Sequence, residues 1–415
     1  MKKRVPVGDL DFGMFVAELD RPWLDSPFLF QGFVVEGTEE LETLREVCDF
    51  VYVDTARSLA FLPEMRGAPA SAVAPEKLPA RLRESALAAR ANDPQRFARH
   101  YQEVIGLQKR AHLALVRLLD ERRLGKLVHV EEIIEVVNDL TESILRNPNV
   151  ALWLTKMREQ DELNAAHSIN TCILAVTFGR HLGLTRDVLE AIGLGAMLHD
   201  IGLNDPANDI IRSKIRLDEE DFKAVRRHPL DGMFSLKRLD DLPRITRDII
   251  RWHHERIDGS GYPHGLKGEE IPQYVRIAGI ADVYDAMTSD RAYRQAMQPP
   301  DALAEMSRDA DSTFGKELVR SFIHCVGIYP VGSVVKLNNG AIAMVASTFP
   351  GVRLSPLVLV LKDSAGRHMS PRRMINLASM QENGKQTWSI DTAVDPVKHG
   401  INITSIAVDE LRAFG

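Results

Sequence analysis

Histidine and aspartate residues in the middle of this chain fall where a helical pattern calls for apolar residues. In the segment 187–202, apolar or small residues recur at helical spacing, and His199 and Asp200 follow before Gly202, a residue type that often ends helices. The apolar stripe continues onto Asp200. A carboxylate on a buried face costs free energy unless it is paired or bound to a cation. We therefore expect Asp200 either to pair with a neighbouring side chain in the core or to bind a cation.

Two later segments repeat this pattern. In 275–286, apolar or small residues occupy offsets 0, 3, 4, 8 and 11, and the missing offset 7 is Asp282. The apolar stripe of 245–252 runs onto His253, with His254 next to it. Carboxylates and imidazoles therefore recur at positions that are predicted to face a core.

Further histidines extend the set. His228 closes the segment 222–227, because Pro229 disfavours helical geometry in the residue before it, and His167 lies in another helical segment. Imidazole and carboxylate together suit zinc, iron, manganese or nickel. One carboxylate can bridge two cations, and two cations about 3.5–4 Å apart can generate a hydroxide nucleophile and stabilise a phosphoryl transition state.

These residues form part of a longer ordered motif. His-Asp-Ile-Gly at 199–202 precedes His-His-Glu-Arg at 253–256, Asp-Gly-Ser-Gly-Tyr-Pro at 258–263 and Ala-Asp-Val-Tyr-Asp-Ala-Met-Thr-Ser-Asp-Arg-Ala-Tyr-Arg at 281–294. In this order and spacing the motif resembles the bacterial HD-GYP domain, over roughly residues 130–328. The stretches 19–33 and 51–54 also resemble a small domain that often precedes HD-GYP domains.

The resemblance implies a fold, an activity and a set of partners. It implies an all-helical HD fold and a cytoplasmic, metal-dependent phosphodiesterase that hydrolyses cyclic di-GMP to the linear dinucleotide, GMP or both, and so acts on motility and biofilm formation. The nucleophile would be a metal-activated water. The cofactors would be two divalent ions, with Fe, Mn or Ni favoured, and no organic cofactor. A homodimer and a protein partner at the Gly-Tyr-Pro loop are left open.

The resemblance also assigns ligands. The matching metal ligands are His167, His199, Asp200, His228, His253, His254 and Asp282. Asp200 matches the bridge between the metals, and His199 and Asp200 are the expected catalytic pair. His167, His199, Asp200 and Asp282 match one metal, and the other three match the second, although the division of the imidazoles stays open.

Substrate contacts are expected outside the metal ligands. Arg291 and Arg294 match family positions that contact ligand phosphates. Because the chain has a net charge of −6, a phosphate ligand needs a local cluster of positive charge, which these two arginines would supply. Tyr262 is expected to stack on a base or to pack within its own loop. An ion pair of Arg291 with Asp290 or Asp285 is the structural alternative.

Two positions depart from the family pattern. Some members bind a third metal through a glutamate one turn before the first histidine, where this chain has Leu163, so we expect two metals. The lysine that usually follows His-Asp-Ile-Gly is Leu203 here. This loss of a cation raises the alternative of a non-catalytic cyclic di-GMP receptor or interaction module. Two further alternatives are a phosphodiesterase for another cyclic dinucleotide such as cyclic GMP-AMP, and an HD nucleotide phosphohydrolase, against which the Gly-Tyr-Pro motif and the paired histidines argue.

Composition narrows the class of protein. The net charge of −6 argues against a nucleic-acid polymer as partner, and three scattered cysteines argue against a disulfide framework or a cysteine zinc site. No apolar run is long enough for a membrane span, and the basic start lacks the apolar core of a signal peptide, so no membrane association is expected.

The chain is predicted to be mainly α-helical, with smaller mixed modules at its ends. We expect a small α+β module at 1–62, a proline-rich linker and connecting helices at 63–129, the catalytic helical domain at 130–328 and a β-rich module at 329–415. The segment Asn338-Asn339-Gly340 predicts a hairpin turn in the last of these.

Overall fold

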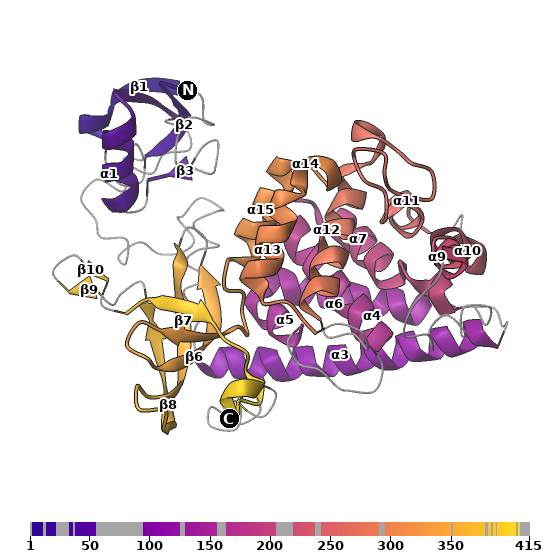
Figure 1. Cartoon of the computed structure of the whole chain (residues 1–415). Helices are drawn as coiled ribbons and strands as arrows, with labels where there is room; N and C mark the ends of the chain where they lie inside the picture. The colour runs from indigo at the N-terminus through magenta and orange to yellow at the C-terminus, as the bar shows by residue number, and fades with distance from the viewer. Residues whose placement is uncertain are drawn as a thin grey trace. The chain divides into compact units, whose positions relative to one another are not determined.

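The computed structural model resolves two compact units, Met1–Arg90 and Ala91–Gly415 (Figure 1). It describes residues 2–10, 14–21, 33–35, 38–54, 94–124, 129–155, 163–204, 219–236, 242–289, 295–349, 352–377, 381–382, 385–386, 388–403 and 406. The two units are described separately below.

The first unit is a small antiparallel sheet with one helix. Strands β1 (Lys2–Pro6), β4 (Phe50–Asp54), β2 (Phe15–Leu19) and β3 (Phe33–Val34) form the sheet in that order, and α1 (Thr38–Val47) precedes β4. Alternate residues of β4, Val51 and Val53, are fully buried against Leu44 of α1. This alternation is the period-2 pattern of a strand with one buried face.

Helices make up most of the second unit. Their bounds are α3 (Pro94–Arg123), α4 (Glu131–Arg146), α5 (Pro148–Leu154), α6 (Leu163–His181), α7 (Arg186–Leu198), η7 (Ile201–Asn204), α9 (Glu219–Val225), α10 (His228–Ser235), α11 (Arg244–Trp252), η10 (Gly268–Glu270), α12 (Gln273–Thr288), α13 (Pro299–Arg308), α14 (Ala310–Thr313) and α15 (Lys316–Val326). The predicted mainly helical character of the chain is confirmed.

Three buried helices form the centre of this unit. Helix α6 packs against α7 and α12, and α11 packs on the other side of α7. Helices α6, α7 and α12 have buried apolar residues around most of their circumference, which allows other helices to pack against them on several sides. The long helix α3 packs on α4, α5 and α6 and runs along the outside of this bundle in Figure 1. The ends of α7 and α11 and the middle of α12 are thereby brought together.

The rest of the unit is a five-stranded antiparallel sheet. Its order is β11 (Ile390–Ala393), β5 (Val334–Leu337), β6 (Ile342–Phe349), β7 (Val352–Lys362) and β8 (His368–Asn376). The short pair β9 (Gln381–Glu382) and β10 (Lys385–Gln386) is separate. The turn predicted at 338–340 connects β5 to β6, and Gly340 has φ 86°, a left-handed conformation that favours glycine.

The sheet and the helices share one hydrophobic core. Met344 and Ala346 of β6 belong to the same buried cluster as the helices, while Ala343 and Val345 face a second core on the other side of the sheet. The indole of Trp153 on α5 donates a hydrogen bond to the carbonyl oxygen of Ala346 (2.9 Å). The β-rich segment is therefore continuous with the helical bundle. The domain boundaries at 62, 129 and 328 stay predictions.

Among the described residues, no helix combines the length and the apolar character that a bilayer crossing requires.

The shared core predicts that the sheet and the helices unfold together. Met344→Ala removes a fully buried side chain and should lower the free energy of unfolding by about 2–5 kcal/mol in a single transition followed by circular dichroism. Met374→Ala in β8, where the side chain is 43% exposed, is the control and should change stability by less than about 0.5 kcal/mol. If the five-stranded sheet and the helices of this second unit unfolded in separate transitions in the Met344→Ala protein, the common core would be contradicted.

Candidate metal centre

Seven histidine and aspartate side chains converge in the helical unit, in two adjacent groups. One group contains Asp200, His228, His253 and His254, and the other contains His167, His199 and Asp282. Within each group the candidate ligand atoms all lie within 4.8 Å of one another. All seven residues predicted as metal ligands are therefore brought together, whereas their roles as ligands and in catalysis stay predictions.

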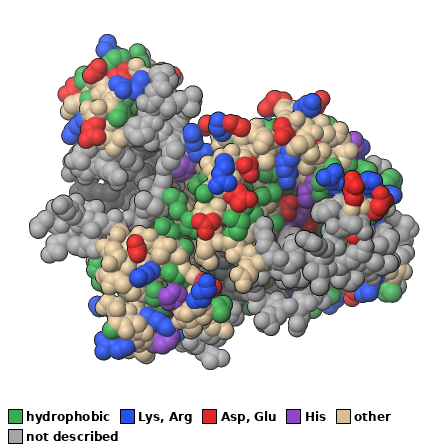
Figure 2. Space-filling model, in the orientation of Figure 1, with side chains coloured by type: hydrophobic (Ala, Val, Ile, Leu, Met, Phe, Trp, Pro, Cys, Tyr) green, Lys and Arg blue, Asp and Glu red, His purple; other side chains and the backbone are tan. Residues whose placement is uncertain are grey.

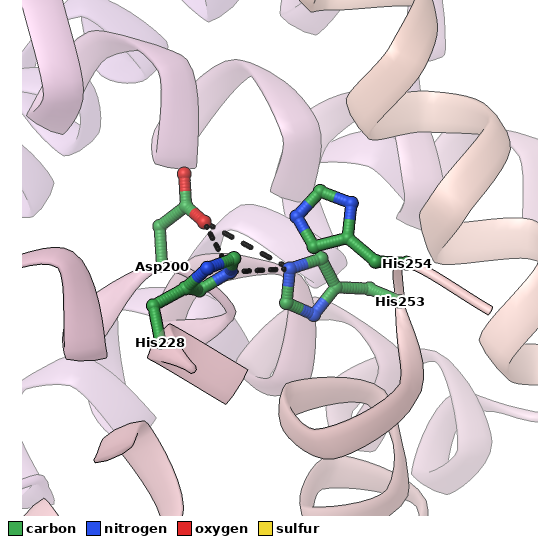
Figure 3. A group of neighbouring side chains, drawn as sticks. All are labelled: Asp200, His228, His253 and His254. Atoms are coloured by element: carbon green, nitrogen blue, oxygen red, sulfur yellow. Dashed lines mark hydrogen bonds and ion pairs between the residues drawn. The ribbon is translucent and has the colours of Figure 1, made fainter. Parts of the chain in front are cut away.

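Each of these side chains is placed at a helix end or on a buried helix face. Asp282 lies on α12 and His167 on α6, His199 and Asp200 directly follow α7, and His228 begins α10. His253 and His254 directly follow α11. Figure 3 shows the first group, with the three imidazoles around the Asp200 carboxylate. In Figure 2, histidine and acidic side chains are visible together in a hollow of the helical unit.

The carboxylate of Asp200 lies between the two groups. Its Oδ1 is 3.2 Å from Nε2 of His228 and 3.8 Å from Nε2 of His253. Its Oδ2 is 3.3 Å from Nε2 of His199 and 4.0 Å from Nε2 of His167. One oxygen thus faces each group, which is the arrangement that a carboxylate bridging two cations requires.

The imidazoles are oriented by hydrogen bonds from their Nδ1 atoms. In three of them Nδ1 donates to a backbone carbonyl oxygen three or four residues earlier: Ala196 for His199 (2.8 Å), Val225 for His228 (2.7 Å) and Ile249 for His253 (3.1 Å). A carbonyl oxygen has no proton to give, so Nδ1 must carry the proton. The lone pair of each neutral ring is then on Nε2, which points into the centre.

This donor set fits divalent cations. Nε2 of His228 and Nε2 of His253 approach to 3.1 Å, and two lone pairs facing each other at that distance repel unless a positive charge lies beside them (Figure 3). Nε2 of His199 is buried and, among the residues that the structure describes, lies 3.3 Å from Asp200 Oδ2 without a hydrogen bond of good geometry. Buried imidazole nitrogens of this kind, next to a carboxylate, are typical ligands of transition metals.

Electrostatics within the two groups differ. Burial and the neighbouring imidazoles hold the pKa of His253 well below its usual value, and burial together with the adjacent imidazole of His228 does the same for His254, so both rings are neutral. Burial also acts to lower the pKa of His167, but hydrogen bonds to Asp282 and Asp285 outweigh it and raise that pKa to about 10. The group that contains Asp282 thus attracts positive charge most strongly.

Close backbone approaches hold the histidine-bearing segments in place. A Cβ atom on Gly202 would lie 2.0 Å from the carbonyl oxygen of His228, so η7 and the start of α10 touch through backbone atoms. A Cβ atom on Gly261 would lie 2.5 Å from the carbonyl oxygen of His254. Only glycine permits these contacts, which explains two of the motif glycines in physical terms.

The Gly-Tyr-Pro loop packs directly on the metal centre. The Tyr262 ring is stacked on that of His254, with ring centroids 4.6 Å apart. The buried carboxylate of Glu255 accepts hydrogen bonds from the backbone amides of His264 (2.7 Å) and Leu266 (2.9 Å). Tyr262 therefore packs on the candidate ligand His254, while base stacking by Tyr262 stays a prediction.

Some predicted residues lie outside the described part of the chain, and two buried carboxylates have contacts that were not predicted. Arg291 and Arg294 fall outside the residues that the structure describes. Asp285 is only 3% exposed and contacts His167, which argues against the structural alternative of a surface ion pair between Asp285 and Arg291. Its position three residues after Asp282, on the next turn of the same helix, was the available signal. No sequence signal indicated the buried role of Glu255, because the loop to which it hydrogen-bonds lacks a periodic pattern.

Two family models match the chain. An HD domain model matches residues 149–318, and a model described as a domain of unknown function (DUF3391) matches residues 2–133. The first match covers the helices that carry all seven clustered residues. The fold and the paired groups therefore define an HD-domain protein.

Named relatives narrow this class. A cyclic di-GMP phosphodiesterase of Pseudomonas aeruginosa is 33% identical over 91% of this chain and 89% of its own length. A cyclic di-GMP phosphodiesterase of Borreliella burgdorferi is 31% identical over 43% of this chain and 47% of its own. A 3'3'-cGAMP-specific phosphodiesterase of Vibrio cholerae is 31% identical over 40% of this chain and 36% of its own length. The chain belongs to the HD-GYP family of HD-domain phosphodiesterases.

The close approach at Gly202 generates a prediction. In Gly202→Ala the new Cβ must displace the backbone at His228, so we expect a loss of about 1–3 kcal/mol in unfolding free energy together with a lower metal content. Denaturant titration and elemental analysis measure the two effects. Gly106→Ala is the control, because nothing lies within 4 Å of its Cβ, and it should be neutral or stabilise α3 by about 0.5–1 kcal/mol. Wild-type stability and metal content in Gly202→Ala would refute this role.

Proposed function

We propose that this protein hydrolyses cyclic di-GMP with the help of two divalent cations, one on each side of Asp200. The observation that supports this most strongly is the position of that carboxylate, which directs one oxygen to His228 and His253 and the other to His199 and His167. The P. aeruginosa relative, which this chain matches over most of its length, is named for the same activity.

The residues of the chain have distinct parts in this proposal. Asp200 would hold both cations, His167, His199 and Asp282 one of them, and the remaining histidines the other. Bound divalent cations of this kind supply a nucleophilic hydroxide at neutral pH and offset charge on the phosphoryl oxygens. Iron, manganese or nickel suit the mixed imidazole and carboxylate set.

The substrate would be held beside the metals by cationic and aromatic side chains. Arg291 and Arg294 would bind the two phosphodiesters, because guanidinium groups can make paired hydrogen bonds to phosphate oxygens. Tyr262, which is stacked on His254, would contact a base of the substrate. The products would be the linear dinucleotide, GMP or both, and the Gly-Tyr-Pro loop could also contact a partner protein.

A single assay separates this proposal from its alternatives. Metal-stripped protein is reloaded with Fe, Mn or Ni and incubated with cyclic di-GMP, and the products are separated by chromatography. We expect cleavage that depends on the metal. Binding without cleavage at every metal would instead indicate a cyclic di-GMP receptor, a candidate that Leu203 favours because it replaces a cation next to the metal centre.

A second candidate substrate is cyclic GMP-AMP, because one relative is specific for that dinucleotide. Competition between the two cyclic dinucleotides in one reaction decides between them through the ratio of their kcat/KM values. The proposal requires a ratio above one in favour of cyclic di-GMP. Nucleoside triphosphates included as a third substrate should remain intact, and their hydrolysis would point to a nucleotide phosphohydrolase.

Removal of the shared carboxylate should abolish metal binding and activity together. Asp200→Ala leaves only imidazoles in one group and Asp282 as the one carboxylate of the other, so we expect at least one equivalent of metal to be lost and cleavage to fall below detection. Asp187→Ala is the control, because Asp187 is exposed in the first turn of the same helix. Full metal content in Asp200→Ala would show that this residue does not bridge the cations.

Loss of a phosphate contact should weaken substrate binding and leave metal binding unchanged. Arg291→Ala should keep the wild-type metal content but raise KM by about tenfold or more, because a charge-assisted hydrogen bond is worth about 1.5–3 kcal/mol. Steady-state kinetics with elemental analysis of the same sample tests this expectation. A loss of metal in Arg291→Ala, or an unchanged KM, would rule out a direct phosphate contact.

A further inference from the structure

Asp285 is a buried carboxylate at the metal centre that does not belong to the set of seven candidate ligands. It lies on α12, three residues after Asp282, and is 3% exposed. Burying a carboxylate costs free energy unless hydrogen bonds or charges compensate. Its contacts therefore indicate what it does.

Both oxygens of Asp285 are used by side chains of α6. Oδ2 accepts a hydrogen bond from Nδ1 of His167 (2.7 Å), and Oδ1 accepts one from Nδ2 of Asn170 (3.0 Å). Asn170 is itself buried and lies one turn after His167 on the same helix. The carboxylate is thus fixed on one side by Asn170 and fixes the imidazole of His167 on the other.

This support differs from that of the other oriented histidines. Nδ1 of His199, His228 and His253 donates to neutral backbone carbonyl oxygens. Only His167, among the candidate ligands that the structure describes, has Nδ1 paired with a carboxylate. The group that contains His167 also contains Asp282, while the three histidines of the other group share only Asp200 with it. One group therefore has two additional negative charges.

We propose that Asp285 is a positioning residue that fixes His167 as a ligand and makes the position formed by His167, His199 and Asp282 the tighter of two cation positions. A carboxylate on the far nitrogen of a ligating histidine fixes the ring and makes its other nitrogen a better donor to the metal. The position formed by His228, His253 and His254 then exchanges its cation more readily. This inference rests on the proposed two-cation function.

The test uses Asp285→Asn in the full-length protein. The side-chain oxygen of an asparagine at this position can still accept a hydrogen bond from Nδ1–H of His167, and its amide can donate one to Asn170 once the amide of Asn170 is rotated. The hydrogen bonds are then kept and only the charge is removed. The measurement is calorimetric titration of metal-free protein with Mn²⁺ alone at fixed pH, compared with wild type and with Asp187→Asn, the exposed control.

We expect two binding steps of different affinity in the wild type. Asp285→Asn should weaken the tighter step by about 10–100-fold and leave the weaker step unchanged, because the loss of an outer partner of a ligand commonly has an effect of this size. His254→Ala should remove the weaker step and so identify it. Excess Mn²⁺ should restore cleavage by Asp285→Asn, which a purely structural defect would not allow.

The possible failures are distinguishable. If Asp285→Asn binds Mn²⁺ as wild type does, or loses only the weaker step, the positioning role is refuted while the two-cation function stands. If the wild type itself binds none of Mn²⁺, Fe²⁺ and Ni²⁺ in the same titration, the proposed function fails. If Asp285→Asn does not fold, Asn170→Ala decides, since freeing Oδ1 of Asp285 should weaken the same tighter step, and an unchanged step would overturn the inference.

Discussion

A single carboxylate, that of Asp200, connects the two groups of side chains on which this site depends. Its two oxygens face imidazole nitrogens from four different helical segments, at 3.2–4.0 Å. Carboxylate and imidazole in a buried setting are stable only when charges balance. The helical unit provides that balance with neutral rings on one side and positively polarised rings with further carboxylates on the other.

The arrangement depends on rigid connections between the backbone and the rings. Imidazole Nδ1 atoms are held by the carbonyl oxygens of the preceding helical turn, so the direction of each Nε2 follows from where α7, α10 and α11 begin or end. Those helix ends are fixed in turn by backbone contacts at Gly202 and Gly261 that no larger residue permits. The glycines of the motif are therefore structural requirements of the metal centre.

Much of the centre could be predicted from sequence because its residues interrupt apolar stripes. Asp282 occupies the position where a helix of period 3.6 should have placed an apolar side chain, and it is buried as that pattern predicts. Asp285 lies at the edge of the same stripe, and its partner Asn170 is on a helix more than 100 residues away, a pairing that no local pattern encodes. The sequence also did not reveal that the sheet shares a core with the helices. The continuous apolar runs of β6 and β7 indicate only that these strands are buried on both faces, not what covers each face.

The central claim is that Asp200 lies between two cations. Anomalous X-ray diffraction from crystals of the Mn²⁺-loaded protein tests it most directly, because each manganese gives its own peak. The account predicts two peaks about 3.5–4 Å apart, one beside each oxygen of Asp200, with His167, His199 and Asp282 around one peak and His228, His253 and His254 around the other. A single peak, or two peaks that do not share Asp200, would contradict it.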